Sequence, residues 1–187
     1  MKKFIDFIHK YVQPKEDELA TIIGYCHIKS YKKDALLLRK GQVAQNFVYL
    51  KKGAIRFFKK DKGRETTIWV ALDDNLAFEM TSYFTGRPTS LYLQAIEDTE
   101  VYVIDRKNIN KMITTMPVWQ EFYRKLWEET IVSMIERITS LLEDSAGKRY
   151  EKLLTESEYP GRVPVKDLAS FIGIAPGSLS RLRSNLR

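Results

Sequence analysis

The hydrophobic pattern changes its period at Pro117, and this change constrains the fold more than any other feature of the sequence. Before it, segments rich in Val, Ile, Tyr, Phe and Thr are separated by single glycines and an Asp-Asp pair, which is typical of short strands joined by turns. After it, apolar residues recur at helical spacing through residues 117–147. The sequence therefore predicts an α+β fold, with strands within residues 34–105 and helices after residue 117.

The strand region is expected to form an antiparallel β-roll, or double-stranded β-helix. Residues 60–63, Lys-Asp-Lys-Gly, have the composition of a hairpin turn. Strands that follow one another at this spacing indicate a sandwich or a roll. Residues 73–90 interrupt the pattern with one turn of helical spacing and a Gly-Arg-Pro loop. An insertion of this kind inside a roll is a place where a ligand could be held.

The helical segment 117–147 carries a wider apolar stripe than one packing surface requires. Part of this stripe follows alternating spacings of four and three, the pattern of a coiled-coil seam. A helix of about 28 residues would be about 40 Å long at 1.5 Å per residue, so it could pack on the roll and on a second copy of itself. The alternative is a long core helix within a monomer. The predicted dimer interface consists of Trp127, Ile131, Met134, Ile138 and Leu141.

Residues 167–183, DLASFIGIAPGSLSRLR, have the pattern of two helices joined by a short turn. A helix over residues 166–172 would end at Gly173, where glycine adopts a left-handed backbone at little cost. Pro176 suits the first turn of a second helix over residues 176–186, because its missing N–H would have no intrahelical partner there. This turn length is typical of a helix-turn-helix. The alternative is an ordinary helical hairpin.

The second helix of this pair presents polar and basic side chains on the face away from its apolar residues. Residues of these types bind phosphates and base edges. The chain has a net charge of +7, and residues 148–187 hold eight basic and four acidic groups, whereas residues 117–147 hold three and six. A basic terminal helix pair predicts binding to double-stranded DNA. The predicted DNA-binding residues are Lys166, Ser178, Ser180, Arg181, Arg183 and Asn185.

The composition argues against several other classes of protein. A single cysteine, Cys26, cannot form an internal disulfide or a four-cysteine iron–sulfur cluster. The two histidines, His9 and His27, do not have metal-ligand spacing, so no metal site and no enzyme of the histidine-rich catalytic roll type is expected. Charges interrupt the apolar start of the chain, and no apolar run is long enough to span a bilayer. The sequence predicts a cytoplasmic protein with no membrane partner.

In this order, the segments resemble the cyclic-AMP receptor protein and Fnr (Crp/Fnr) family of bacterial transcription regulators over nearly the whole chain. The resemblance implies a sensor roll over residues 1–116, a dimerisation helix over 117–147 and a DNA-binding domain over 148–187 whose wing is truncated. It also admits RNA polymerase as a partner. The matching residues are Lys-Lys-Gly at 51–53, Phe-Glu-Met at 78–80, Gly-Arg-Pro-Thr-Ser at 86–90, Ala-Ile-Glu-Asp-Thr-Glu-Val-Tyr-Val-Ile at 95–104, and the terminal segment 167–183.

The resemblance places a ligand pocket in the roll, but the pocket residues depart from the family pattern. Members that bind cyclic AMP have a Gly-Glu-Leu segment, and an Arg-Ser pair that holds the phosphate. Here a phenylalanine replaces the glycine, and Thr89 replaces the arginine, whose guanidinium would make a bidentate contact. Arg87 is the alternative cation. The sequence predicts that cyclic AMP does not bind with useful affinity, and an unidentified small-molecule effector stays open. The expected pocket residues are Phe78, Glu79, Met80, Arg87, Thr89 and Ser90.

The terminal helices depart from the family as well. Pro176 and Gly177 stand where relatives present an arginine and a glutamate to bases, whereas Arg181 matches a retained base-contacting arginine. We therefore expect a dimeric, sequence-specific DNA-binding regulator with its own base preference. The alternative function is a small-molecule-binding module whose terminal helices mediate protein association.

Overall fold

The computed structural model describes residues 1–156 and 158–185, and only the backbone of Glu156 and Asn185. In this part of the chain the strands form two four-stranded antiparallel sheets, with the orders β1-β8-β3-β6 and β2-β7-β4-β5. The predicted α+β fold with a β-roll is confirmed. The strands are β1 (His27–Tyr31), β2 (Leu36–Leu38), β3 (Asn46–Lys52), β4 (Ile55–Asp61), β5 (Arg64–Ala71), β6 (Asn75–Leu76), β7 (Tyr92–Ala95) and β8 (Thr99–Asp105).

Alternating side chains divide the core of the roll into two layers. Leu50 of β3 and Val101 of β8 lie between the two sheets. Their neighbours Tyr49 and Tyr102 point to the opposite face of the same sheet, where helices cover them. This alternation is the period of two that strand geometry imposes.

The structure also shows where the strands begin and where the chain turns between them. The predicted hairpin at residues 60–63 is confirmed, because Lys62 and Gly63 both have positive φ (45° and 82°) between β4 and β5. The sequence analysis missed β1, which precedes the expected strand region and pairs with β8. Most of its side chains are exposed, so it lacks the apolar alternation by which a strand is recognised.

Gly53 in the Lys-Lys-Gly segment has a structural reason to be glycine. Its φ is +113°, and a Cβ there would collide with the backbone and side chain of Thr99. The turn between β3 and β4 therefore approaches β8 too closely for any side chain.

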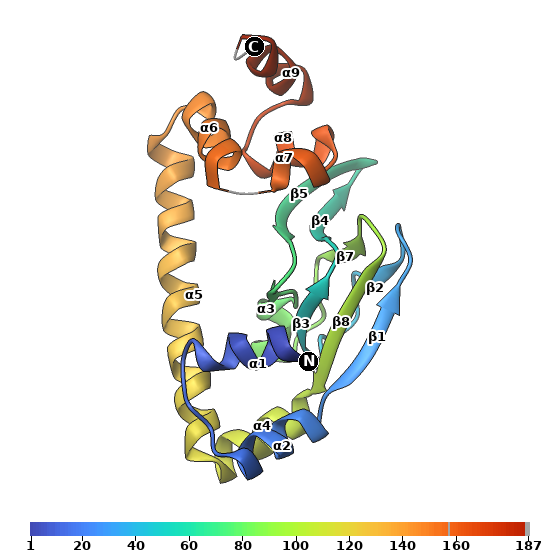
Figure 1. Ribbon diagram of the computed structural model, residues 1–187. Helices are drawn as coiled ribbons and strands as arrows, with labels where there is room; N and C mark the ends of the chain where they lie inside the picture. Colours follow the sequence, from blue (N-terminus) through green and yellow to red (C-terminus); the bar gives the residue numbers. More distant parts are fainter. Residues whose placement is uncertain (157, 186–187) are drawn as a thin grey trace.

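Helices cover one face of the roll and then continue away from it. Helix α5 runs alongside the roll, with α4 near its beginning and the terminal helices at its far end (Figure 1). Pro117 occupies the first turn of α5, and Trp119, Phe122 and Leu126 are buried against the roll. The helices before the terminal segment are α1 (Lys2–His9), α2 (Glu16–Gly24), α3 (Met80–Thr85), α4 (Arg106–Thr115) and α5 (Pro117–Glu143).

Helix α5 is 27 residues long and ends at Glu143, four residues before the expected boundary at 147. Asp144 has an extended backbone, and its carboxylate accepts a hydrogen bond from Ser140 at 2.7 Å. A new helix begins at Ala146, so residues 146 and 147 belong to the helices that follow α5. The terminal helices are α6 (Ala146–Glu156), α7 (Tyr159–Arg162), α8 (Val165–Phe171) and α9 (Pro176–Asn185).

The hydrophobic core of the terminal helices is continuous with the roll. Leu168 and Phe171 of α8 belong to one buried cluster with Val70 of β5 and Ile96, which follows β7. The terminal segment, predicted as a third domain, therefore packs directly against the roll.

Candidate functional site

Helices α8 and α9, here called the terminal helix pair, have the geometry of a helix-turn-helix. Gly173 has a φ of +79°, as predicted from its place after the first helix. Its N–H donates to Ser170 O at 3.0 Å, and the N–H of Ile174 donates to Ala169 O at 2.9 Å. Bonds of this kind satisfy the last carbonyls of a helix and turn the chain. Pro176 is the first residue of α9, also as predicted.

Small and apolar residues hold the terminal helix pair together. Ala169 and Leu179 are fully buried, and Leu168 and Ile172 nearly so. A methyl group of Leu141, near the end of α5, lies 3.4 Å from where a Cβ on Gly173 would stand. The end of α5 therefore contacts the turn between the two helices.

The outer face of α9 is polar. Ser180 and Arg181 are exposed, whereas Ser178 and Arg183 are partly buried. The Ser180 hydroxyl donates to Pro176 O at 3.2 Å, and Arg181 Nε donates to Gly177 O at 3.4 Å. These bonds stay within the helix, so both side chains face away from the rest of the chain. The side chain of Asn185 lies outside the described residues.

Lys166, the remaining predicted DNA contact, lies on α8 rather than α9. Its side chain is exposed, and its Nζ is 4.0 Å from a carboxylate oxygen of Glu65 on β5. The structure thus places this lysine next to the roll, apart from the predicted contacts on α9.

The interior of the roll contains a cavity of about 100 Å³. Phe78 and Glu79 line it, as the sequence analysis expected, and its remaining lining comes from strand and loop residues that alternation alone did not single out. Both oxygens of Glu79 accept hydrogen bonds from backbone N–H groups, from Thr81 at 3.0 Å and Ser82 at 2.7 Å. The carboxylate therefore caps the N-terminus of α3.

The other expected pocket residues lie elsewhere. Thr89 is buried, but its Oγ1 accepts a bond from Leu91 N at 3.0 Å, while Arg87 and Ser90 are exposed. The carbonyl of Arg87 accepts the Ser82 hydroxyl at 2.6 Å, so its backbone holds α3. Met80 is partly buried. None of these four residues lines the cavity, whose lining contains no arginine or lysine.

The predicted dimer seam divides into two parts. Trp127 packs on the roll, with its ring 5.6 Å from Phe78 and 4.8 Å from Phe84. Beyond it, α5 exposes apolar side chains, here called the α5 stripe, some of which are more than half exposed. The α5 stripe includes three residues outside the expected seam. Its members are Ile131, Val132, Met134, Ile135, Ile138, Leu141 and Leu142.

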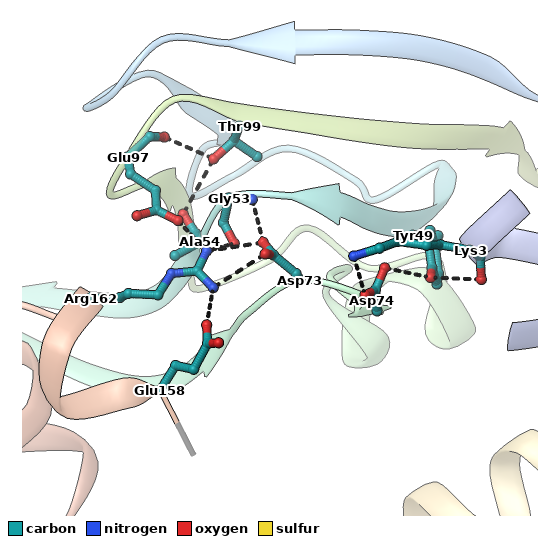
Figure 2. A network of polar contacts seen from close by, with 10 residues as sticks. All are labelled: Lys3, Tyr49, Gly53, Ala54, Asp73, Asp74, Glu97, Thr99, Glu158 and Arg162. Carbon is teal, nitrogen blue, oxygen red and sulfur yellow. Dashed lines mark hydrogen bonds and ion pairs between the residues drawn. The ribbon is translucent and has the colours of Figure 1, made fainter. Parts of the chain in front are cut away.

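Arg162, at the end of α7, joins the terminal helices to three turns of the roll (Figure 2). It donates to Gly53 O at 2.9 Å and Asp73 Oδ1 at 3.0 Å, and forms an ion pair with Glu97. Burial raises the pKa of Asp73, but the hydrogen bonds from Arg162 and the Gly53 amide outweigh burial and hold that pKa below its ordinary value. Sequence analysis counted Arg162 only as part of a basic segment.

Among the described residues, no cluster of three or more His, Cys, Asp and Glu side chains is arranged to hold a metal ion. Burial raises the pKa of the Cys26 thiol to about 12, so this cysteine is a protonated, partly buried side chain. No helix in this part of the chain is long and apolar enough to cross a membrane.

Comparison of the sequence with known families and curated proteins gives a consistent result. Residues 28–116 match the cyclic nucleotide-binding domain. The cAMP-activated global transcriptional regulator CRP of Salmonella typhimurium is 25% identical over 107 residues, which are 56% of this chain and 51% of that protein. The chain thus spans about half the length of the curated relatives it matches.

Solved structures extend the likeness to nearly the whole chain. The c-di-GMP responsive global regulator CLP of Xanthomonas campestris has a TM-score of 0.70 and 15% identity, covering 92% of this chain and 91% of that one. FixK2 of Bradyrhizobium japonicum has a TM-score of 0.70 and 22% identity, covering 86% and 84%. The fold of the roll, the long helix and the terminal helices is therefore shared with these proteins.

Proposed function

We propose that this chain belongs to the Crp/Fnr family and regulates transcription by binding double-stranded DNA as a homodimer. Its roll matches the cyclic nucleotide-binding domain, and its fold is shared with solved regulators. RNA polymerase is the partner that such a role implies.

The observation that carries this proposal is the terminal helix pair with its polar outer face. Gly173 and the small Ala169 set the crossing of α8 and α9, and Ser180 and Arg181 remain exposed on α9. Arginine donors of this kind recognise guanine in the major groove, and hydroxyls bind phosphates. Ser178 and Arg183 flank this face, while Asn185 belongs to the proposal by sequence alone.

The α5 stripe supports the homodimer. Ile131, Ile135 and Ile138 are each more than half exposed on one helix. A contiguous apolar surface of this kind on a helix is typical of a protein–protein interface. Two copies paired along α5 would present two α9 helices, which is how helix-turn-helix dimers bind two half-sites one helical turn apart.

The roll does not favour cyclic AMP as its effector. Ligand pockets are commonly about 300–1,000 Å³, and the cavity here is about 100 Å³. Its one charged lining residue is Glu79, so a cyclic phosphate would meet a carboxylate and no guanidinium. In the proposed function, the protein therefore binds DNA without cyclic AMP. Any effector that enters the cavity is a smaller or uncharged molecule.

The test is selection of bound duplexes from a random pool, with and without cyclic AMP. We expect a palindromic consensus with half-sites about one helical turn apart, unchanged by the nucleotide. Binding should weaken steeply as salt increases, because phosphate contacts release counterions. No enrichment in either arm, together with salt-insensitive association between protein chains, would favour the association module instead.

A further inference from the structure

Helix α8 covers the free edge of a sheet. Strand β5 is the last strand in the order β2-β7-β4-β5, so one side of its backbone has no strand partner. Thr67 N donates to the Ser170 hydroxyl at 2.8 Å, and that hydroxyl donates to Thr67 O at 3.1 Å. The hydroxyl of Tyr159 donates to Val70 O at 2.8 Å. Side chains of the terminal helices thus take the place of a neighbouring strand along this edge.

A buried ion pair lies beneath this contact. Arg56 of β4 and Asp167 of α8 are 5% and 4% exposed, and Arg56 Nη1 is 2.7 Å from Asp167 Oδ1. The same carboxylate oxygen accepts the Thr67 hydroxyl at 2.8 Å. The pair joins residues 111 positions apart in the sequence.

The rest of the Arg56 guanidinium is held by the roll. Its Nε donates to Gln94 at 2.9 Å and its Nη2 to Glu65 at 2.8 Å, and the group lies 4.1 Å from the ring centre of Phe58. Because Nε and Nη2 are each bonded to a residue of the roll, the roll itself orients the guanidinium so that Nη1 faces Asp167. The planar fork of an arginine suits this arrangement, and a lysine would not reproduce it.

Helix α5 closes the same contact from the other side. The guanidinium of Arg137 lies 3.8 Å from the ring centre of Phe171 and 5.2 Å from that of Trp69. It donates to Phe171 O at 2.8 Å and to Ile68 O at 3.2 Å. One side chain of α5 thus contacts both β5 and α8, so the position of the terminal helix pair is set by the roll and the long helix together.

We propose that Arg56 and Asp167 are positioning residues for DNA binding: they fix α8 against β5, and this docked arrangement, reached without an effector, is the one that binds DNA. The inference rests on the proposed function. A ligand can shift a conformational equilibrium only by its different affinity for two states. The roll cavity is small and no arginine or lysine lines it, so in this proposal the buried contacts of the chain itself determine which state is populated.

The experiment compares three variants with the wild type. Arg56→Gln removes the charge that pairs with Asp167, and Arg56→Lys keeps a charge but loses the planar fork that also binds Gln94 and Glu65. The double variant Arg56→Met with Asp167→Leu replaces the pair with apolar side chains, a change that buried ion pairs often tolerate. Hydrogen exchange at the Thr67 amide measures docking directly. Fluorescence anisotropy with the selected duplex, at one salt concentration, measures DNA affinity.

In both single variants the Thr67 amide should exchange faster and specific DNA affinity should fall by about tenfold or more, because the buried Asp167 carboxylate loses its charge partner or that partner's geometry. The double variant should restore both quantities to within about threefold of the wild type, given that the apolar pair needs no partner. Arg56 is buried and does not contact DNA, so rescue by the apolar pair separates positioning from any direct contact. Circular dichroism and sedimentation check that each variant is folded and dimeric.

Three outcomes would contradict the positioning role, the role of the ion pair or the DNA-binding function, and the measurements distinguish them. If the single variants expose Thr67 but bind DNA as tightly as the wild type or more tightly, docking does not position the terminal helix pair for binding. If the single variants keep Thr67 protected, the ion pair does not control docking. If neither the wild type nor any undocked variant binds a duplex, the proposed DNA-binding function itself fails.

Discussion

The contact between α8 and β5 and the α5 stripe are two surfaces of opposite character. The first is closed within one chain, and its buried polar atoms, such as Thr67 N and the Asp167 carboxylate, have partners. The second exposes Ile135 and Ile138 on the outer side of α5. Apolar surface stabilises a folded or associated state only when it is removed from water. The contact between α8 and β5 thus fixes the terminal helix pair within one chain, whereas in the proposed dimer the α5 stripe would be buried only by a second copy.

The largest effect should come from a charge in the α5 stripe. Ile135→Asp would bury one carboxylate from each copy without a partner, so we expect the dimer to dissociate about 100-fold more readily or worse. Sedimentation velocity over a concentration series measures this. Glu136→Gln, an exposed neighbour on α5, is the matched control and should leave the dimer intact. An Ile135→Asp protein that stays dimeric would show that the stripe serves another purpose.

Removing a buried ring from the contact between α8 and β5 should lower the stability of the single chain and leave the proposed dimerisation unchanged. Phe171 is 6% exposed and stacks on Tyr159 at 5.3 Å between ring centres. Phe171→Ala should lower the free energy of unfolding by about 3 kcal/mol or more, the usual cost of removing a buried aromatic ring. Denaturant unfolding followed by tryptophan fluorescence checks this, because Trp69 contacts Phe171. The half-exposed Phe84→Ala is the control and should cost less.

A substitution on the exposed face of α9 should change which DNA sequence is preferred, an effect that substitutions in the contact between α8 and β5 or in the α5 stripe should not have. Arg181→Ala should weaken binding to the preferred duplex by about 1–3 kcal/mol and relax the sequence preference at one position in each half-site. Repeating the duplex selection with this variant measures both quantities. A uniform loss on preferred and random DNA alike would identify Arg181 as a phosphate contact.

The smallest effect should appear on acidification. The pKa of Asp73 is lower in the folded chain than its ordinary 3.8. Its contribution to stability is therefore complete above about pH 5, and is lost as the pH falls below 3.8 and through the lowered value. The protection factor of the Gly53 amide, which donates to Asp73, should fall over that interval, once the exchange rate is corrected for its intrinsic pH dependence. Asp73→Asn should weaken this pH dependence, and an unchanged profile would show that Arg162 acts through its ion pairs with Glu97 and with Glu158, whose carboxylate is 2.9 Å from Arg162 Nη1.

The sequence predicts those features that depend on neighbouring residues. The turn at Gly173, the start of α9 at Pro176 and the hairpin at residues 60–63 follow from local backbone preferences. Glu79 was expected in a ligand pocket, and it does line the roll cavity, but both of its carboxylate oxygens accept hydrogen bonds from the backbone of Thr81 and Ser82 at the start of α3.

The sequence does not predict the features that depend on distant pairing. Arg56 has the pattern of an ordinary strand residue, and Asp167 stands out only as an acid in a basic segment. Their burial becomes possible only because each supplies the charge that the other needs. Similarly, Trp127 has the spacing of a dimer seam, but the rings of Phe78 and Phe84 come close to it only in the folded chain.

The position of Leu141 has a practical consequence. This side chain belongs to the α5 stripe and also stands against Gly173 in the turn of the terminal helix pair. A fluorescent label attached through a cysteine at the neighbouring, strongly exposed Leu142, in a Cys26→Ala background, would lie close to both the proposed subunit boundary and that turn. One optical signal could then report pairing of the chains and engagement of DNA, without a label on the nucleic acid.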